Sequence, residues 1–357
     1  MAAPFCSARL ADAGASVVKI ERPEGDFARG YDDVCAGQSS YFVWLNRGKD
    51  SLIVDLASAA GKQALADLLA KADILVQNLK PGALDRLGFG PQKLRQDHPS
   101  LIVCSISGYG ETGPLAQRKA YDLLIQAESG LSSVTGGPEA PARVGISVVD
   151  IATGATAYSA ILEALLARAV TGEGADIRVS MFDVMADWLT VPLLHQEGGK
   201  PPKRIGMAHP SIAPYGVFKT KDGKDVLISI QSDREWVKFC TEFLKRSEKA
   251  SDPTFAKNVN RVANRAATDA MVAAAFADMT ETDAHDLLTK ADVAFATVND
   301  MAALSAHPHL RRITVETEAG PVAYPAPAPV FIGNPRSYGA VPALGENKLA
   351  QDKARAI

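Results

Sequence analysis

Asp150 has a carboxylate side chain and directly precedes a stretch with a strong helical pattern, Ile151–Ala169. This position allows two roles. One interpretation is structural: the carboxylate would cap the helix by accepting a backbone N–H, which contributes about 1 kcal/mol. The other is catalytic: the positive end of the helix dipole favours an ionised carboxylate, which can act as a nucleophile. The two roles are compatible, and the local sequence by itself favours the cap.

A second group of candidates is cationic. These side chains lie near the ends of predicted strands or in the loops that follow them. In an open parallel sheet, ligands collect beyond the carboxyl ends of the strands, and several cations there suit a phosphorylated ligand. Ordinary solvated surface charge is the alternative, and composition does not choose between the two. The residues are Arg22, Arg47, Lys49, Arg86 and Lys119.

Residues 108–113 read GYGETG and match the pattern G-x-G-x-x-G directly after a predicted strand. A dinucleotide site needs these glycines to open a helix whose N-terminus meets the pyrophosphate. Pro114 and the cluster Gln117–Lys119 follow instead, and no acidic residue ends a second strand about 20 residues later. The pattern therefore favours a flexible glycine-rich loop over a nicotinamide site.

The elements that must position these residues alternate between strand and helix in the first half of the chain. The strands are apolar on both faces, which is typical of a parallel sheet covered by helices on both sides. The fold class is therefore predicted to be α/β. Predicted strands are 16–20, 51–56, 73–76, 101–106 and 176–181; predicted helices are 6–13, 60–72, 91–97, 121–133, 151–169 and 182–195.

The pattern changes after residue 195. Seven glycines and prolines between 196 and 215 indicate a crossover between domains. A hairpin follows, with strands at 216–220 and 225–230 and Asp222-Gly223 in its turn. Helices dominate 233–290, a strand is predicted at 293–298, and 320–344 reads as a return path. We expect a large domain (1–195), a linker (196–215), a small α+β domain (216–310), and a return linker with the C-terminal part of the large domain (311–357).

Composition excludes several function classes. A chain of 357 residues suggests two domains, and 47% hydrophobic with 22% charged residues provides a large core. The net charge of -3, without long runs of one sign, argues against nucleic-acid binding and against a polybasic membrane anchor. The most apolar stretch, 161–170, contains Glu163 and Arg168, and the N-terminus lacks the pattern of a secretory signal. We expect neither nucleic acid nor membrane as a partner.

The four cysteines, Cys6, Cys35, Cys104 and Cys240, form no C-x-x-C pair and have no metal-site spacing. They indicate reduced thiols and a cytoplasmic protein. His307 and His309 are the only close histidine pair and have no acidic or cysteine neighbour, so no metal site is predicted.

Ordered strings along nearly the whole chain resemble the class III CoA-transferase family, which includes formyl-CoA and carnitine CoA-transferases. The resemblance depends on the order and spacing of many motifs rather than on one pattern. The strings are KIERP (19–23), LNRGK (45–49), DILVQN (73–78), PGA (81–83), SISGYG (105–110), GP (113–114), KAYD (119–122), VDI (149–151), TGEG (171–174), APYG (213–216) and HP (307–308).

The resemblance implies a Rossmann-like large domain, a smaller second domain, and two chains interlocked as a homodimer. It implies that Asp150 is the catalytic nucleophile, which forms a mixed anhydride and then an aspartyl-CoA thioester. The substrates would be an acyl-CoA and a carboxylic acid, with the coenzyme A thioester as substrate and no permanently bound cofactor. Arg22, Arg86 and Lys119 match positions that hold the CoA phosphates and adenine end, and Val54, Asn78 and Leu79 match positions lining the adenosine pocket.

Two departures from the family pattern stand out. The family begins with a further strand and turn before Ala2, and this strand lies inside the sheet. Without it, unpaired backbone groups and apolar surface would be exposed. The glycine-rich loop that covers the formyl-CoA transferase site is also absent between Tyr215 and Trp236, which argues against oxalate or formate as the acceptor.

The leading hypothesis is an acyl-CoA:carboxylate CoA-transferase. The loop 204–211, with Lys203, Arg204 and His209, is a candidate for binding a second carboxylate, as in mesaconate, citramalate, itaconate or succinate. A 2-methylacyl-CoA racemase is the alternative on the same fold, although Tyr121 stands where racemases have a histidine. Tyr, with an ordinary pKa of about 10, is a poor base at neutral pH. A non-catalytic CoA-binding relative is the third hypothesis.

Overall fold

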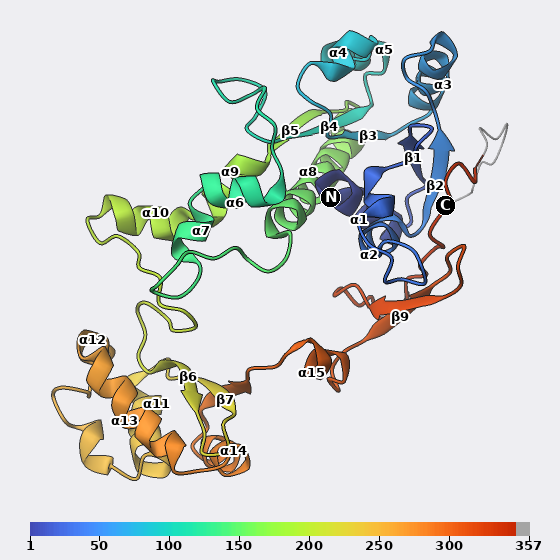
Figure 1. Ribbon diagram of the computed structural model, residues 1–357. Coiled ribbons are helices and arrows are strands. Elements are labelled where there is room, and N and C mark those ends of the chain that lie inside the picture. Colours follow the sequence, from blue (N-terminus) through green and yellow to red (C-terminus); the bar gives the residue numbers. More distant parts are fainter. Residues whose placement is uncertain (348–357) are drawn as a thin grey trace. The chain divides into compact units, whose positions relative to one another are not determined.

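The computed structural model describes residues 1–347 and divides them into two compact units (Figure 1). The first unit contains residues 1–131, 143–191 and those from 311 onward; the second contains 132–142 and 192–310. The sequence assigned 132–142 to the large domain. These residues belong to the second unit because the Arg204 guanidinium donates to the carbonyl oxygens of Ser133, Gly137 and Pro138 at 3.1–3.3 Å.

The first unit contains a three-stranded parallel sheet in the order β3 (Ile74–Gln77), β4 (Ile102–Ser107), β5 (Asp176–Ser180). The central strand β4 is buried along almost its whole length, as expected for a strand covered on both faces. The carboxyl ends of these strands therefore form one edge, where the sequence places several candidate site residues.

A second parallel ladder pairs β1 (Val17–Glu21) with β2 (Lys49–Ile53). Among the described residues no ladder joins β1 to β3, so the unit has two parallel ladders rather than the single sheet predicted from the alternation of strands and helices. Helix α1 (Ala2–Asp12) contacts both β1 and β3.

Helix α8 (Val148–Thr171) is the longest element of the described chain and packs against α1 and β4 (Figure 1). Gly154 permits close contact, because a Cβ there would lie only 2.5 Å from the Ala2 carbonyl oxygen. By length and composition alone α8 could cross a membrane. Its buried residues, among them Ala157 and Ile161, belong to the main core of the unit, which explains the apolar composition.

The remaining elements of the first unit cover these ladders or connect them. The predicted helix 121–133 is two helices, since Gly130 has a φ of 89° and ends the first of them. The elements are η1 (Phe27–Gly30), α2 (Ser40–Asn46), α3 (Ala59–Leu69), α4 (Ala83–Leu87), α5 (Pro91–Asp97), α6 (Asp122–Glu128), α9 (Met181–Trp188), β9 (Arg312–Val315) and β10 (Val322–Pro325). The second of the two helices, α7 (Leu131–Val134), belongs to the second unit from Ser132 onward.

The second unit is built on an antiparallel sheet, β6 (Tyr215–Lys219), β7 (Asp225–Ser229) and β8 (Ala294–Thr297), with β7 in the centre. The predicted hairpin is present, and Gly223 in its turn has a φ of 78°. An aromatic core packs beside the sheet. The helices are α10 (Thr190–Glu197), α11 (Asp233–Lys238), η2 (Phe239–Phe243), η3 (Ser247–Ala250), α12 (Asn258–Ala263), α13 (Arg265–Ala277), α14 (Glu281–Lys290) and α15 (Met301–Ser305).

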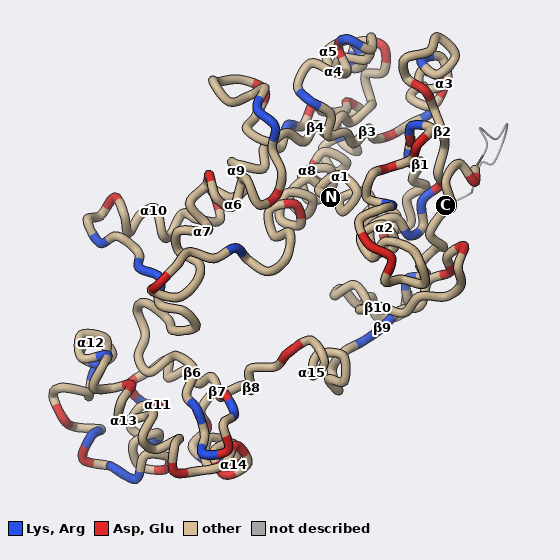
Figure 2. The backbone as a smooth tube through the Cα atoms, viewed as in Figure 1, with Lys and Arg blue, Asp and Glu red and all other residues tan. Residues whose placement is uncertain are grey.

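Charged residues of both signs are interspersed along both units (Figure 2). This distribution agrees with the small net charge of -3. The arrangement gives no long stripe of one sign in the described chain of the kind that nucleic-acid binders use.

Candidate active site

Asp150 lies in the first turn of α8 but does not cap it. The helix begins at Val148, three residues earlier than predicted, and its N-cap is Ser147. The capping oxygen comes from another helix: Asp122 Oδ2 accepts the N–H of Val149 at 2.8 Å and the N–H of Asp150 at 3.1 Å. The structural interpretation of Asp150 was therefore wrong, and its carboxylate is not used for capping.

The Asp150 side chain is 15% exposed and lies beside the start of α1. Its Oδ1 accepts the backbone N–H of Ala2 at 3.2 Å and lies 3.9 Å from the amino nitrogen of Met1. Among the residues that the structure describes, Oδ2 has no hydrogen-bond partner. Burial raises the pKa of Asp150 above its ordinary value, and the negative charge of Asp122 raises it further, while the Met1 amino group and the Ala2 N–H oppose the shift.

Exposed aromatic side chains gather around η1 and α2. The rings of Tyr31 and Tyr41 pack edge to face, with their centroids 5.4 Å apart. The centroid of the Tyr31 ring also lies 5.6 Å from that of Phe27. Partial burial raises the pKa of the Tyr31 hydroxyl, and the nearby carboxylates of Asp26 and Asp150 add to this shift. Tyr31 is half exposed, so it offers an aromatic surface near the free carboxylate.

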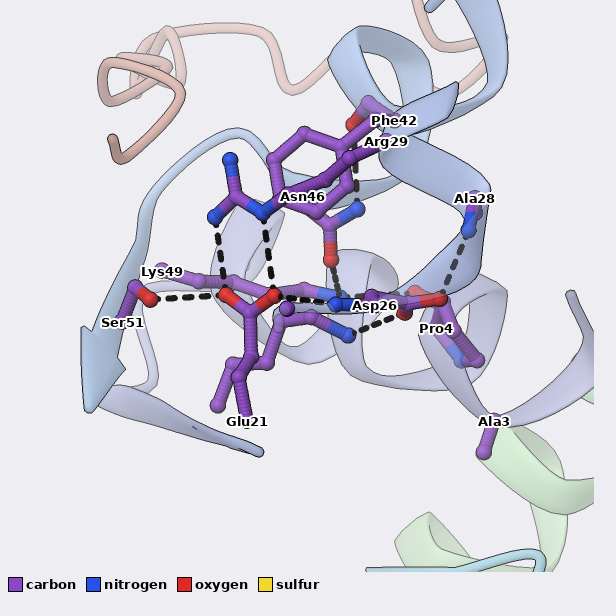
Figure 3. Close-up of polar contacts among 12 residues, drawn as sticks. Ala3, Pro4, Glu21, Asp26, Ala28, Arg29, Phe42, Asn46, Lys49 and Ser51 are labelled. Carbon is purple, nitrogen blue, oxygen red and sulfur yellow. Dashed lines mark hydrogen bonds and ion pairs between the residues drawn. The ribbon is translucent and has the colours of Figure 1, made fainter. Parts of the chain in front are cut away.

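The loop that carries Arg22 and Tyr31 is anchored by the buried carboxylate of Glu21 (Figure 3). Glu21 accepts two hydrogen bonds from the Arg29 guanidinium, at 2.8 and 3.0 Å, one from the Ser51 hydroxyl at 2.7 Å and one from the Asp26 N–H at 2.9 Å. Burial by itself raises the pKa of Glu21, but these hydrogen bonds and the Arg29 charge outweigh it and hold the pKa below its ordinary value.

A second carboxylate supports the same loop. Asp26 accepts the Lys19 ammonium at 2.6 Å and the Ala28 N–H at 2.9 Å, so it caps η1 (Figure 3). The Arg29 guanidinium also lies 3.7 Å from the centre of the Phe42 ring on α2. Together with Glu21, these contacts fix the backbone between the end of β1 and the aromatic cluster.

Two of the five candidate cations are buried and belong to the core rather than to a ligand site. Lys49 lies at the amino end of β2, and its Nζ donates to Pro4 O, Ser7 Oγ and Asn46 Oδ1 at 2.8–3.2 Å (Figure 3). Full burial lowers its pKa well below the ordinary value. Arg47 forms a buried ion pair with Asp12 of α1. Both side chains hold α1 in place, and neither is available to a phosphate.

The other three candidate cations, Arg22, Arg86 and Lys119, are exposed. Arg22 follows β1, and its Nε donates to the Gly25 carbonyl oxygen at 3.1 Å. Arg86 lies on α4, and Lys119 lies in the loop between β4 and α6.

The predicted adenosine-pocket residues lie at the carboxyl ends of strands. Val54 is buried directly after β2 and donates its N–H to Glu21 O at 2.8 Å; Asn78 and Leu79 are exposed directly after β3. Leu79 lines a small recess at the ends of β3 and β4 with Ser105, whose buried hydroxyl has no hydrogen-bond partner among the described residues. Of the six residues predicted to bind CoA, only Leu79 lines this recess among the described residues. The other five do not line it.

The glycine pattern at 108–113 forms a loop, as predicted. No helix follows until Asp122, so no helix N-terminus is available to a pyrophosphate at this point. Gly108 is needed for packing, because a Cβ there would lie 2.2 Å from the Cβ of Ala120.

Arg204 and His209, two of the three side chains that the sequence suggested for a second carboxylate, make contacts within their own unit, whereas Lys203 is exposed. The Arg204 guanidinium donates from Nε, Nη1 and Nη2 to three backbone carbonyl oxygens. The His209 ring stacks on Tyr215 with centroids 5.2 Å apart, and its Nδ1 accepts the Ser211 N–H. These contacts stabilise loop 204–211 within the second unit.

Neither thiol nor metal chemistry is supported by the described residues. Burial raises the pKa of Cys6, Cys104 and Cys240 to about 12 each, which keeps these thiols protonated. Within residues 1–347 no group of three or more His, Cys, Asp or Glu side chains could hold a metal ion.

The sequence model described as CoA-transferase family III matches residues 1–348. The chain belongs to CoA-transferase family III. It is 37% identical over 357 residues to an acetyl-CoA:oxalate CoA-transferase of Acetobacter aceti, covering 98% of this chain and 91% of that one. It is 35% identical over 280 residues to a succinyl-CoA:mesaconate CoA-transferase of Haloarcula hispanica, covering 74% and 69%.

A crystal structure of a CaiB/BaiF family protein from Brucella suis matches with a TM-score of 0.82 at 35% identity. It covers 97% of this chain and 93% of that one. The family III CoA-transferase described here is therefore an enzyme that uses CoA thioesters, on a mixed α/β fold with parallel strands.

Sequence reasoning missed the residues that support the site of this CoA-transferase. Asp122 was noticed only as part of a motif, and its capping of α8 depends on a contact across 27 residues. Glu21 was likewise read as part of a string. The signal available in the sequence was an acidic residue at the end of a predicted apolar strand, with Arg and Lys close to it.

We predict that Glu21→Gln lowers the free energy of unfolding at pH 7 by about 2 kcal/mol, because Arg29 loses its carboxylate partner. Since the folded-state pKa of Glu21 lies below the unfolded value near 4.3, this contribution is present above about pH 4 and is lost as pH falls through the folded pKa. The difference between wild type and variant in urea unfolding should therefore shrink below about pH 4.

Glu128→Gln is the matched control. Glu128 pairs with Arg118 at 3.2 Å on the surface, so its removal should change stability by less than about 0.5 kcal/mol. Equal destabilisation by the two variants would contradict the assignment of Glu21 as the anchor of the loop.

Proposed function

We propose that this enzyme transfers CoA from an acyl-CoA to a carboxylic acid through covalent intermediates on Asp150. The observation that carries the proposal is a partly buried carboxylate in the first turn of α8 whose Oδ2 has no partner among the described residues, while another residue caps the helix. Family membership supplies the reaction class, and the geometry supports Asp150 as the nucleophile.

In the first half-reaction, Asp150 attacks the thioester carbonyl carbon, the C–S bond breaks, and CoA leaves as a thiolate. The thiolate then attacks the Asp150 carbonyl carbon of the mixed anhydride. The bond between Asp150 Cγ and the bridging oxygen breaks, the donor acid leaves with that oxygen as a carboxylate, and an aspartyl-CoA thioester remains. No net proton is gained or lost.

The second half-reaction reverses this order with a new acid. The acceptor carboxylate attacks the aspartyl thioester and releases CoA thiolate, which then attacks the acceptor's carbonyl carbon. The product thioester leaves, and Asp150 is regenerated. The free energy of the thioester is kept in covalent form throughout, provided that water is excluded from the anhydride.

Partial burial suits Asp150 to this role. Desolvation raises its pKa, so the carboxylate is a stronger nucleophile than a fully solvated one. The Ala2 N–H binds Oδ1 at 3.2 Å and orients the carboxylate with Oδ2 free for attack.

We expect Asp150→Asn to lower kcat by at least about 10³-fold, because an amide oxygen cannot form the anhydride. The Asn side chain keeps the shape and the acceptor for Ala2, so affinity for CoA should stay within a few-fold. Mass analysis of protein incubated with acyl-CoA should find an adduct on residue 150 in the wild type only. Retention of most activity by the variant would remove Asp150 from the mechanism.

Asp183→Asn is the matched control for this variant. Asp183 is an exposed acid in the first turn of α9, so it has the same side chain at the same helical position without the burial. Its amide variant should keep wild-type activity.

For the acceptor, we propose a small dicarboxylic acid such as mesaconate, citramalate, itaconate or succinate. The two named relatives act on oxalate and mesaconate, which are both dicarboxylic. Oxalate therefore belongs among the candidates, although the missing glycine-rich loop argued against it. The support no longer includes Arg204 and His209, whose polar groups are used within their own loop.

A panel of acyl-CoA donors and acids, followed by mass analysis, tests this proposal. Dicarboxylic acceptors should give CoA thioester products faster than monocarboxylic acids of equal length, and equal rates would contradict the choice of acceptor. Deuterium exchange at the α-carbon of a 2-methylacyl-CoA without transfer would favour the racemase alternative. Binding of CoA without either reaction would favour the non-catalytic alternative.

We further propose that Arg22, Arg86 and Lys119 bind the CoA phosphates and adenine end, and that Val54, Asn78 and Leu79 line the adenosine pocket. The exposure of the three cations supports this placement, as do the positions of Arg22, Val54 and Asn78 directly after parallel strands. Arg22→Ala and Arg86→Ala should raise the KM for acyl-CoA about tenfold with little change in kcat, because these contacts are remote from bond making. Arg95→Ala, which removes an exposed cation from α5, is the control. An unchanged KM in both variants would refute the placement.

A homodimer is the proposed assembly. Leu162, Leu166 and Val170 recur every four residues along one face of α8 and are 39%, 73% and 88% exposed. Such an exposed apolar ridge is typical of an interface, and a second copy of the chain is its proposed partner. A monomeric mass in solution at micromolar concentration would contradict this assembly.

A cytoplasmic location stays a prediction from the cysteines.

A further inference from the structure

We infer that Asp122 is a positioning residue for the reaction: it fixes the first turn of α8 from outside the helix and leaves the Asp150 carboxylate free to attack. This inference rests on the proposed role of Asp150. It assigns a function to a side chain that touches the backbone of the nucleophile rather than the substrate.

The helix start has unusual hydrogen bonding. Ser147 is the N-cap, yet its side chain makes no capping hydrogen bond. Asp122 Oδ2 instead accepts the N–H groups of Val149 and Asp150 at 2.8 and 3.1 Å. An acid within the first turn of a helix could have capped by itself, but then one of its oxygens would be tied to the backbone. Capping by Asp122 satisfies these N–H groups without using Asp150.

Asp122 is itself held rigidly by Gln126, one turn later on α6. Asp122 Oδ1 accepts the Gln126 amide N–H at 2.6 Å. Gln126 is 1% exposed, and its Oε1 accepts the Val144 N–H at 2.9 Å. Its amide nitrogen also donates to Ile146 O at 3.4 Å. The pair thus fixes both the loop that leads into α8 and the first turn of the helix.

The charge of Asp122 also acts on the nucleophile. Three groups face Asp150: the carboxylate of Asp122 from α6, the amino group of Met1 before α1, and the hydroxyl of Tyr31 after η1. Asp122 disfavours the ionised form of Asp150, and the amino group favours it. Removing the Asp122 charge should therefore lower the pKa of Asp150 and weaken it as a nucleophile.

Asp122→Asn tests the inference by steady-state kinetics across pH. We expect kcat to fall about 10- to 100-fold, because a small misplacement of a nucleophile has an effect of this size, and the KM for acyl-CoA to stay within about twofold. The acid limb of kcat should move to lower pH, because ionised Asp150 is required and its pKa falls. A purely structural role would reduce the active fraction without moving this limb.

Two further variants separate charge from geometry. Asp122→Glu keeps the charge, so its acid limb should stay at the wild-type pH even if kcat falls. Gln126→Met removes the hydrogen bond that holds Asp122, so kcat should fall about tenfold with the acid limb unchanged. If Asp122→Asn does not fold, the Gln126→Met result decides: wild-type kcat in that variant would overturn the inference.

Failure of the inference can be distinguished from failure of the proposed function. Single-turnover acylation of residue 150, followed by mass analysis, should be slow in Asp122→Asn and fast in the wild type. An adduct forming at the wild-type rate in Asp122→Asn, with an unmoved acid limb, would overturn the role of Asp122 and leave the role of Asp150 intact. Lack of any adduct in the wild type would instead refute the proposed function.

Discussion

The carboxylate of Asp122 accepting two N–H groups at the start of α8 is the interaction on which the site depends. A helix start needs an acceptor for its unpaired N–H groups, and the nearest acid in the chain is Asp150 itself. Supplying the acceptor from α6 separates two tasks that would otherwise compete for the same oxygens. One carboxylate stabilises the helix, and the other stays available for chemistry in a partly dry environment.

The first unit uses buried polar contacts to place its N-terminal helix. Lys49 donates to three neutral acceptors, two of them on α1, and Arg47 pairs with Asp12 at the end of α1. Buried groups of this kind are costly unless every partner is present, so they specify one position of α1 rather than a range of positions. The Ala2 N–H reaches Asp150 only in that position.

Local patterns predicted the elements well but not the contacts of the site. Helix α5 spans Pro91–Asp97 as predicted, because proline at its first position marks the start. The mixed α/β class and the hairpin around Gly223 also follow from local patterns. Burial of Arg47 could not be predicted, since its partner Asp12 lies 35 residues earlier and on another element. The same holds for Asp122, whose role depends on α6 lying against the start of α8. Strand periodicity also gave no sign that β1 and β3 belong to separate ladders.

Gly154 has a consequence beyond packing. It stands one turn after Asp150, where the first turn of α1 packs against α8, and it has no side chain to hold the two helices apart. The spacing between two backbones thus sets how closely an amide group approaches a reactive oxygen. The reactivity of the Asp150 carboxylate therefore depends on how closely α1 packs against α8. An apolar substitution between these two helices can alter that reactivity even when every polar residue stays in place.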